Sequence, residues 1–242
     1  MNLVIDAGNT AVKLAVFDAK KRVSLITVGY DEVTSGLKTI FDTYPKIRSI
    51  LLSTVGPWAL SKEDWLPGHC TLYILDSQMK LPYKIAYGTP ETLGKDRMAL
   101  AAAAISEYPN QNVLVIDAGT CITYDLVTAD GAYLGGAISP GMRMRYTALH
   151  KGTSGLPKLD PEIPKELIGS STAGSIHSGV VNGIRFEIEG AVNQYQTHFP
   201  DLSVILSGGD AQFLSKQLKN TIFAHSNFLL QGLNFLLEYN KS

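Results

Sequence analysis

The segment Asp6-Ala7-Gly8-Asn9-Thr10-Ala11-Val12-Lys13 combines the residue types that are needed to hold a chain of phosphates. Glycine permits a tight turn and lets backbone amides approach a dense anion closely. Asn9 and Thr10 add polar side chains, and Lys13 adds a compact cation. The carboxylate of Asp6 would repel phosphate unless a cation lay between them, so we expect Mg²⁺ there, bound directly or through water. The segment is therefore predicted to bind the phosphates of ATP, with an ordinary hairpin turn as the alternative.

A second copy of this pattern occurs near the middle of the chain. Val115-Ile116-Asp117-Ala118-Gly119-Thr120 repeats the apolar strand and Asp-Ala-Gly turn of Val4 to Thr10. We interpret the pair as a structural duplication. In the second copy, Thr120 offers a hydroxyl to phosphate and Asp117 offers hard oxygen ligands to a cation. A turn that repeats the first for structural reasons alone is the alternative.

The segment Gly94-Lys95-Asp96-Arg97 places one carboxylate between two cations, after a flexible glycine. This composition suits a site for a polar substrate. Asp96 is a candidate to orient an attacking hydroxyl and accept its proton. The alternative is a solvated helical face with local ion pairs.

Other polar residues give weaker signals. Gly208-Gly209-Asp210 follows a predicted strand, where it either lets the backbone pass close to adenine or ribose or forms a tight strand-to-helix turn. The two cysteines, Cys70 and Cys121, are far apart, which suggests neither a disulfide framework nor a zinc site and fits a reducing compartment. The five histidines lack paired metal-ligand spacing.

Short apolar strands and helices are predicted to position these residues. The expected strands cover residues 3–5, 11–18, 23–28, 47–53, 72–75, 113–116, 122–127 and 204–207. The expected helices cover residues 33–43, 142–150, 175–199, 214–218 and 228–239, together with an Ala-rich helix through 98–106 that opens after Thr89-Pro90. Pro109-Asn110 ends the Ala-rich helix, so we predict an α/β fold with domains at 1–110 and 111–242.

The composition is that of an ordinary globular protein. The chain has 242 residues, of which 45% are apolar and 18% charged, which is enough for two small cores and argues against disorder. The formal net charge of -1 gives no electrostatic case for a nucleic-acid partner. The sequence has neither a signal-peptide pattern at its start nor an apolar run long enough for a bilayer, so we expect no membrane partner and a cytoplasmic location.

Taken together and in order, these motifs resemble those of the type III pantothenate kinases, in the acetate and sugar kinase/Hsp70/actin superfamily. Asp6 to Lys13 looks like the family's first phosphate motif, and Asp117 to Asp125 looks like its second. Gly94 to Arg97, with Tyr87 upstream, looks like the substrate motif. The segments Gly135 to Gly141 and Thr172 to Gly179 also match, so the resemblance covers nearly the whole chain.

The resemblance implies two duplicated ribonuclease-H-like domains that face each other across an ATP cleft. It implies phosphoryl transfer from ATP to pantothenate, the first step towards coenzyme A, with Asp96 as the general base. It also implies that Asp117 binds a monovalent cation, K⁺ or NH₄⁺, alongside Mg²⁺. The residues implied to contact pantothenate are Tyr87, Gly94, Lys95, Asp96, Arg97 and Thr172. The family forms homodimers with the substrate site near the interface, so Thr172 serves its own or the neighbouring subunit.

Two departures from the family pattern are minor. Cys121 replaces a frequent alanine and His177 a frequent glutamine, and neither change removes an assigned chemical group. Two alternatives remain open: another small-molecule kinase of the superfamily, and a nucleotide-binding regulator without catalysis. The intact segment 94–97 weighs against the regulator, because a protein that only binds nucleotide needs no placed base.

Overall fold

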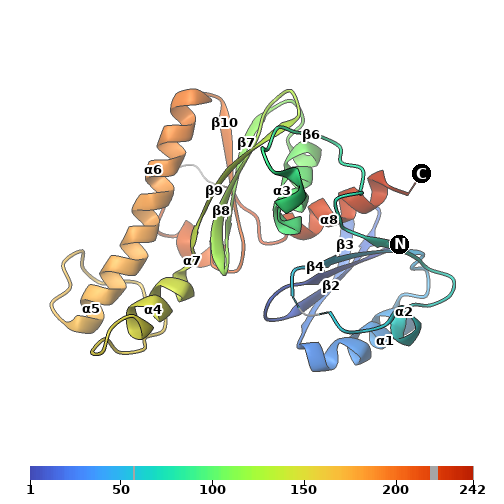
Figure 1. The fold of residues 1–242 in the computed structure, drawn as a ribbon, viewed down its shortest axis with the longest axis horizontal. Coiled ribbons are helices and arrows are strands. Elements are labelled where there is room, and N and C mark those ends of the chain that lie inside the picture. Colours follow the sequence, from blue (N-terminus) through green and yellow to red (C-terminus); the bar gives the residue numbers. More distant parts are fainter. Residues whose placement is uncertain (57, 219–222, 242) are drawn as a thin grey trace. The chain divides into compact units, whose positions relative to one another are not determined.

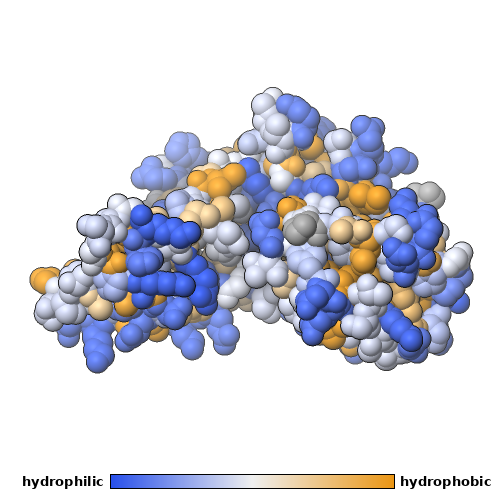
Figure 2. Space-filling view, turned by 60° about the horizontal axis from the view of Figure 1, so that its bottom comes forward, coloured by the Kyte–Doolittle hydropathy of each residue, from blue (hydrophilic) through white to orange (hydrophobic). Residues whose placement is uncertain are grey.

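Two sheets, one in each of two units, carry the two Asp-Ala-Gly turns (Figure 1). The computed structural model describes residues 1–56, 58–218 and 223–241. Unit 1 comprises Met1–Pro109 and Phe228–Ser242, and unit 2 comprises Asn110–Asn227. On the face shown in Figure 2, hydrophobic residues form separate patches among hydrophilic ones. Within the described residues, no helix is both long enough and apolar enough to cross a bilayer.

The sheet of unit 1 has the strand order β3-β2-β1-β4-β5. Antiparallel hairpins join β1, β2 and β3, whereas β4 runs parallel to β1 and β5 runs parallel to β4. The strands are β1 (Asn2–Ala7), β2 (Val12–Asp18), β3 (Lys21–Val28), β4 (Ser49–Thr54) and β5 (Thr71–Ile74). The central strands are buried almost throughout, as apolar runs covered on both faces should be, while the edge strand β3 alternates.

The remaining elements of unit 1 connect or cover these strands. They are η1 (Tyr30–Glu32), α1 (Val33–Thr43), α2 (Lys62–Trp65), β6 (Lys84–Ile85), η2 (Pro90–Thr92), α3 (Lys95–Glu107) and α8 (Phe228–Tyr239). Because successive strand residues point to opposite faces, Leu3 and Ile5 pack with Val33, Leu37 and other α1 residues on one face. Helix α8 contacts β1, β4 and α3. The Ala-rich α3 is buried from Met98 to Ala104, so its small side chains permit this close packing.

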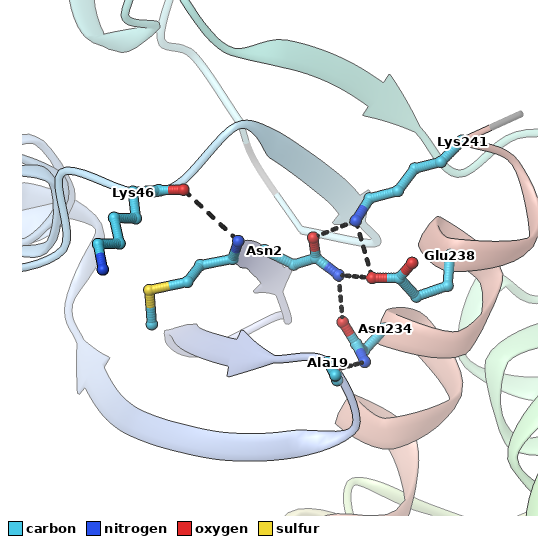
Figure 3. A network of polar contacts seen from close by, with 7 residues as sticks. Asn2, Ala19, Lys46, Asn234, Glu238 and Lys241 are labelled. Atoms are coloured by element: carbon cyan, nitrogen blue, oxygen red, sulfur yellow. Dashed lines mark hydrogen bonds and ion pairs between the residues drawn. The ribbon is translucent and has the colours of Figure 1, made fainter.

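A polar network fastens the C-terminal helix to the first strand (Figure 3). The Asn2 side-chain amide donates to Asn234 Oδ1 at 2.7 Å and to Glu238 Oε1 at 2.6 Å. Asn234 Nδ2 donates to the Ala19 carbonyl at 2.9 Å, and Lys241 Nζ donates to Asn2 Oδ1 at 2.5 Å. Buried polar groups need such partners, so this network specifies where α8 docks.

The sequence predicts a second domain that runs to residue 242, but the structure groups the segment after residue 227 with unit 1.

Unit 2 repeats the arrangement of unit 1. Its strands lie in the order β11-β10-β7-β8-β9, with antiparallel pairing through β7, β8 and β9 and parallel pairing through β7, β10 and β11. They are β7 (Asn112–Ala118), β8 (Cys121–Val127), β9 (Ala132–Pro140), β10 (Leu202–Ser207) and β11 (Phe223–Ala224). The duplication and the α/β class predicted from the two Asp-Ala-Gly turns are therefore confirmed.

Helices cover one face of the second sheet. They are α4 (Met142–Lys151), α5 (Thr172–His177), η3 (Ser178–Asn182), α6 (Gly183–His198) and α7 (Ala211–Ser215). Ile184, Ile188 and Val192 of α6 are fully buried against apolar residues of β7, β8 and β10. Strand β9 has no predicted counterpart, because its glycines hid the strand pattern. Gly136 has no side chain because a Cβ there would overlap the Tyr124 backbone of β8.

The contact between α3 and α8 gives a test of packing. A Cβ on Gly232 would overlap the Ala99 carbonyl, so Gly232→Ala should lower the free energy of unfolding by about 1–3 kcal/mol. Gly190→Ala in α6 is the matched control, since its Cβ would meet no atom within 4 Å. That change should stabilise by about 0.5–1 kcal/mol through helix propensity. Urea unfolding measures both, and equal effects of the two changes would contradict the packing account.

Candidate functional site

The first Asp-Ala-Gly turn lies between β1 and β2. The Gly8 amide donates to the Ala11 carbonyl at 3.1 Å, which closes the turn and leaves Asn9 and Thr10 exposed at its tip. Asp6 and Lys13 are cross-strand partners, with Lys13 Nζ 3.8 Å from Asp6 Oδ2. The turn thus presents two polar side chains and one cation to solvent. Ala7 and Val12 are fully buried, so the side chains of these two predicted ligand contacts pack in the core.

The segment that follows β4 supports this turn from behind. The amides of Val55 and Gly56 donate to the Ala7 carbonyl at 3.0 and 3.1 Å. The hydroxyl of Tyr30 donates to the Gly8 carbonyl at 2.5 Å. The carbonyl side of the turn is therefore occupied by the protein itself.

The predicted substrate segment meets the first turn at the start of α3. Lys95 Nζ lies 3.5 Å from Thr54 Oγ1, and Thr54 is the β4 residue paired with Ala7. Asp96 lies in the first turn of the helix, where its Oδ1 accepts from the Arg97 amide at 2.8 Å. The structure of unit 1 alone therefore brings the first Asp-Ala-Gly turn and the predicted base together.

The pKa of Asp6 reflects this neighbourhood. Burial raises the pKa of Asp6 above its ordinary value, Lys13 opposes the rise, and the charge of Asp96 adds to it. Two carboxylates that influence each other in this way attract a cation. Among the described residues, no group of three or more His, Cys, Asp or Glu side chains forms a metal cage. A cation bound here would therefore need oxygens from the nucleotide or water as well.

Two further predicted substrate contacts also lie together in unit 1. The Arg97 guanidinium carbon is 5.6 Å from the centre of the Tyr87 ring, within the range of a cation–π contact. Arg97 is only 5% exposed, so its orientation is fixed by packing. The pair forms a preorganised wall beside the segment Gly94 to Arg97.

The second Asp-Ala-Gly turn lies between β7 and β8 of unit 2. Its Gly119 amide donates to the Cys121 carbonyl at 2.9 Å, and Thr120 is exposed at the tip. Asp117 pairs in register with Thr123 of β8 and Ser207 of β10. The neighbouring strands therefore add hydroxyl-bearing residues at the level of the carboxylate.

Gly208-Gly209-Asp210 supports the second turn as the segment after β4 supports the first. The Asp210 amide donates to the Ala118 carbonyl at 2.9 Å. Gly208 adopts a φ of 96°, and a Cβ there would overlap Ala118. The segment is thus a tight strand-to-helix turn that leads into α7, as one of the two sequence interpretations predicts.

Thr172 lies in unit 2, exposed at the first position of α5. It lines a pocket of about 1060 Å³ beside α4, together with Arg145 and Leu149. Ser171 caps the helix by accepting from the Gly174 amide at 3.1 Å. The pocket is lined by hydroxyl groups and apolar side chains, and its one guanidinium, that of Arg145, is paired with Glu187.

Sequence reasoning missed Tyr30, Thr54 and Gly56. Each contacts or pairs with the first turn from more than 20 residues away in the sequence, so no local motif predicts it. The one available signal is Gly56, which follows a predicted strand as Gly208 does.

The comparisons with known proteins decide the family. The family model described as type III pantothenate kinase matches residues 2–194. The chain belongs to the type III pantothenate kinase family. The type III pantothenate kinase of Christiangramia forsetii is 50% identical over 242 residues, and the alignment covers 100% of this chain and 100% of the relative. That of Flavobacterium johnsoniae is 44% identical over 241 residues, or 99% of this chain and 98% of the relative.

A solved structure extends the likeness in fold beyond pantothenate kinases. The ROK hexokinase of Thermus thermophilus aligns with a TM-score of 0.56 over 99% of each chain, at 13% identity. At that identity, the likeness concerns the fold alone. The expected duplicated architecture of this pantothenate kinase is thus shared with a sugar kinase.

The raised pKa of Asp6 predicts a conflict between stability and function. When folding raises the pKa of a carboxyl group, the free energy of unfolding falls as the pH rises from the pKa of the unfolded state through that of the folded state. Because the ionised carboxylate is the form that opposes folding, Asp6→Asn should increase the free energy of unfolding at neutral pH while it lowers kinase activity. Urea unfolding at pH 7 checks the first effect and an ADP-release assay the second. Asp18→Asn, at an exposed end of β2, is the control, and a lower stability for Asp6→Asn than for this control would refute the account.

Proposed function

We propose that this chain transfers the terminal phosphoryl group of ATP to the primary hydroxyl of pantothenate, with Asp96 as the general base. The reaction is the first step of coenzyme A biosynthesis. Membership of the pantothenate kinase family supports the reaction. The position of Asp96, close enough to Asp6 to affect its pKa, is the observation that supports the assignment of the base.

The proposed role of Asp96 follows from its surroundings. The Arg97 amide orients one carboxylate oxygen, and the other takes the proton from the attacking hydroxyl. Phosphoryl transfer is catalysed mainly by positioning and charge stabilisation. Asn9, Thr10, the turn amides and Lys13 supply these to the phosphates, and Thr120 of unit 2 adds a hydroxyl.

Two cations fit the proposed chemistry. Mg²⁺ would be held by ATP oxygens and Asp6, directly or through water, since the buried carboxylate and the nearby Asp96 favour a positive ion. K⁺ or NH₄⁺ would be held by Asp117, whose cross-strand partners Thr123 and Ser207 offer further hard oxygens. When bound, the cations neutralise charge that spreads over the transferring phosphoryl group.

Pantothenate carries one carboxylate and several hydrogen-bonding groups, which suit the proposed contacts. Lys95 and Arg97 provide the positive charge, and Tyr87, Gly94 and Thr172 complete the set. We infer that the chain acts as a homodimer in which Thr172 lies near the interface, as the family resemblance implies. A cytoplasmic location fits the supply of ATP and the two free cysteines.

An assay of ADP release with different acceptors distinguishes this function from those of other kinases of the superfamily. ADP release should depend on pantothenate and should not be driven by glucose or acetate. A chain that binds ATP but releases no ADP with any acceptor would instead be a nucleotide-binding regulator.

Loss of the base should be visible in turnover. Asp96→Asn should lower kcat by roughly 10²–10⁴-fold, the usual effect of removing a general base. Steady-state ADP release measures it, with an unfolding curve to show that the variant is folded. Glu91→Gln, an exposed residue shortly before the segment, should keep normal turnover. Near-normal kcat in Asp96→Asn would remove Asp96 from this role.

Stimulation of the kinase by a monovalent cation should depend on Asp117. The wild type should release ADP faster as K⁺ replaces a large organic cation at constant ionic strength, and Asp117→Ala should abolish that stimulation. Asp201→Ala, an exposed carboxylate of unit 2, should retain it. Wild-type activity that is independent of K⁺ and NH₄⁺ would refute the assignment.

A further inference from the structure

Tyr30 is the one side chain outside the predicted motifs that is seen to hydrogen-bond to the backbone of the first phosphate turn, in the described parts of unit 1. It lies in η1, between β3 and α1, and donates its hydroxyl proton to the Gly8 carbonyl at 2.5 Å. The ring is half-buried and packs against the same core as β1 and α1. Tyr30 is therefore anchored independently of the turn that it contacts.

This contact controls the direction of a neighbouring amide. The peptide unit between Gly8 and Asn9 is planar, and in the trans form its C=O and N–H point in opposite directions. A hydroxyl that holds the Gly8 carbonyl on the inner side therefore turns the Asn9 N–H to the outer side. Hydrogen bonding at the carbonyl also polarises the same peptide unit, which makes its N–H a better donor to an anion.

Gly56 leaves room for this arrangement. A Cβ at that position would overlap both the Gly8 carbonyl oxygen and the Tyr30 hydroxyl. The Gly56 amide also donates to the Ala7 carbonyl at 3.1 Å. Any larger residue at 56 would therefore displace two successive carbonyls of the turn.

We propose that Tyr30 and Gly56 are positioning residues for ATP, because together they fix the turn so that the Asn9 amide faces the phosphates. The proposal rests on the proposed function of Asp6 to Lys13 as the phosphate-binding segment. Burial and the charge of Asp6 raise the pKa of Tyr30, so its hydroxyl remains a donor throughout the range of pH in which the enzyme is assayed.

A merely structural role makes a different prediction. If Tyr30 served only the core, its ring would matter and its hydroxyl would not. If it positions the turn, removal of the hydroxyl should weaken ATP binding while the fold and the substrate segment remain unchanged. Tyr30→Phe separates the two because it keeps the ring.

The test measures the Kd for ATP with Mg²⁺ by calorimetry, the KM for pantothenate and the unfolding temperature of the intact protein. Tyr30→Phe should raise the Kd for ATP about 3- to 12-fold, the effect of one net hydrogen bond. The KM for pantothenate should stay within about twofold. Gly56→Ala should weaken ATP binding more strongly, since it displaces the turn itself. Tyr44→Phe is the matched control, because Tyr44 packs against the same core just after α1.

Lys13→Ala distinguishes failure of this inference from failure of the proposed site. If Lys13→Ala weakens ATP binding and Tyr30→Phe does not, the positioning role of Tyr30 is wrong and the phosphate site stands. If neither change alters the Kd for ATP, both are wrong. A Tyr30→Phe variant in which ATP binding, the KM for pantothenate and unfolding temperature all deteriorate together would also overturn the inference, because it would indicate a general structural role.

Discussion

The carbonyl oxygen of the alanine in each Asp-Ala-Gly turn is the point on which the proposed site depends. In unit 1 the Ala7 carbonyl accepts from the Val55 and Gly56 amides, and in unit 2 the Ala118 carbonyl accepts from the Asp210 amide. In both cases the donors lie just beyond the parallel strand that neighbours the turn. An unpartnered carbonyl at this buried position would be unfavourable, so the parallel pairing and the turn geometry require each other. The two units therefore share this hydrogen-bonding pattern as well as the short Asp-Ala-Gly sequence.

The arrangement at the first turn favours binding over stability. Burial raises the pKa of Asp6, and the charge of Asp96 raises it further, so the ionised form of Asp6 opposes folding. Lys13 compensates only in part, since its side chain is 47% exposed and its nitrogen is 3.8 Å from the carboxylate. A site with this residual negative field attracts cations that can accompany a nucleotide. Such a conflict between local stability and charge is common where a protein holds a polyanion together with metal ions.

The sequence predicts the parts of the site that are local. The two turns, the segment Gly94 to Arg97 and most of the strands and helices follow from composition and periodicity, because turn chemistry and side-chain alternation act over a few residues. Periodicity does not predict the Gly-rich strand β9, because Gly136 is required by a close approach of the Tyr124 backbone that lies in another strand. Tyr30 was missed for a related reason, since its hydrogen bond to Gly8 spans 22 residues. The docking of α8 on β1 depends on Asn2 and Asn234, which are separated by almost the whole chain.

The position of α8 has a consequence for synthesis on the ribosome. Unit 2 is continuous from Asn110 to Asn227, whereas unit 1 needs the segment that follows it. The nascent chain therefore exposes all of unit 2 before the helix that covers β1, β4 and α3 becomes available. Domains usually fold from the N-terminus during translation, but here the first sheet to emerge is the last to be completed. Until then, the apolar face of β1 and the alanine surface of α3 lack their partner helix.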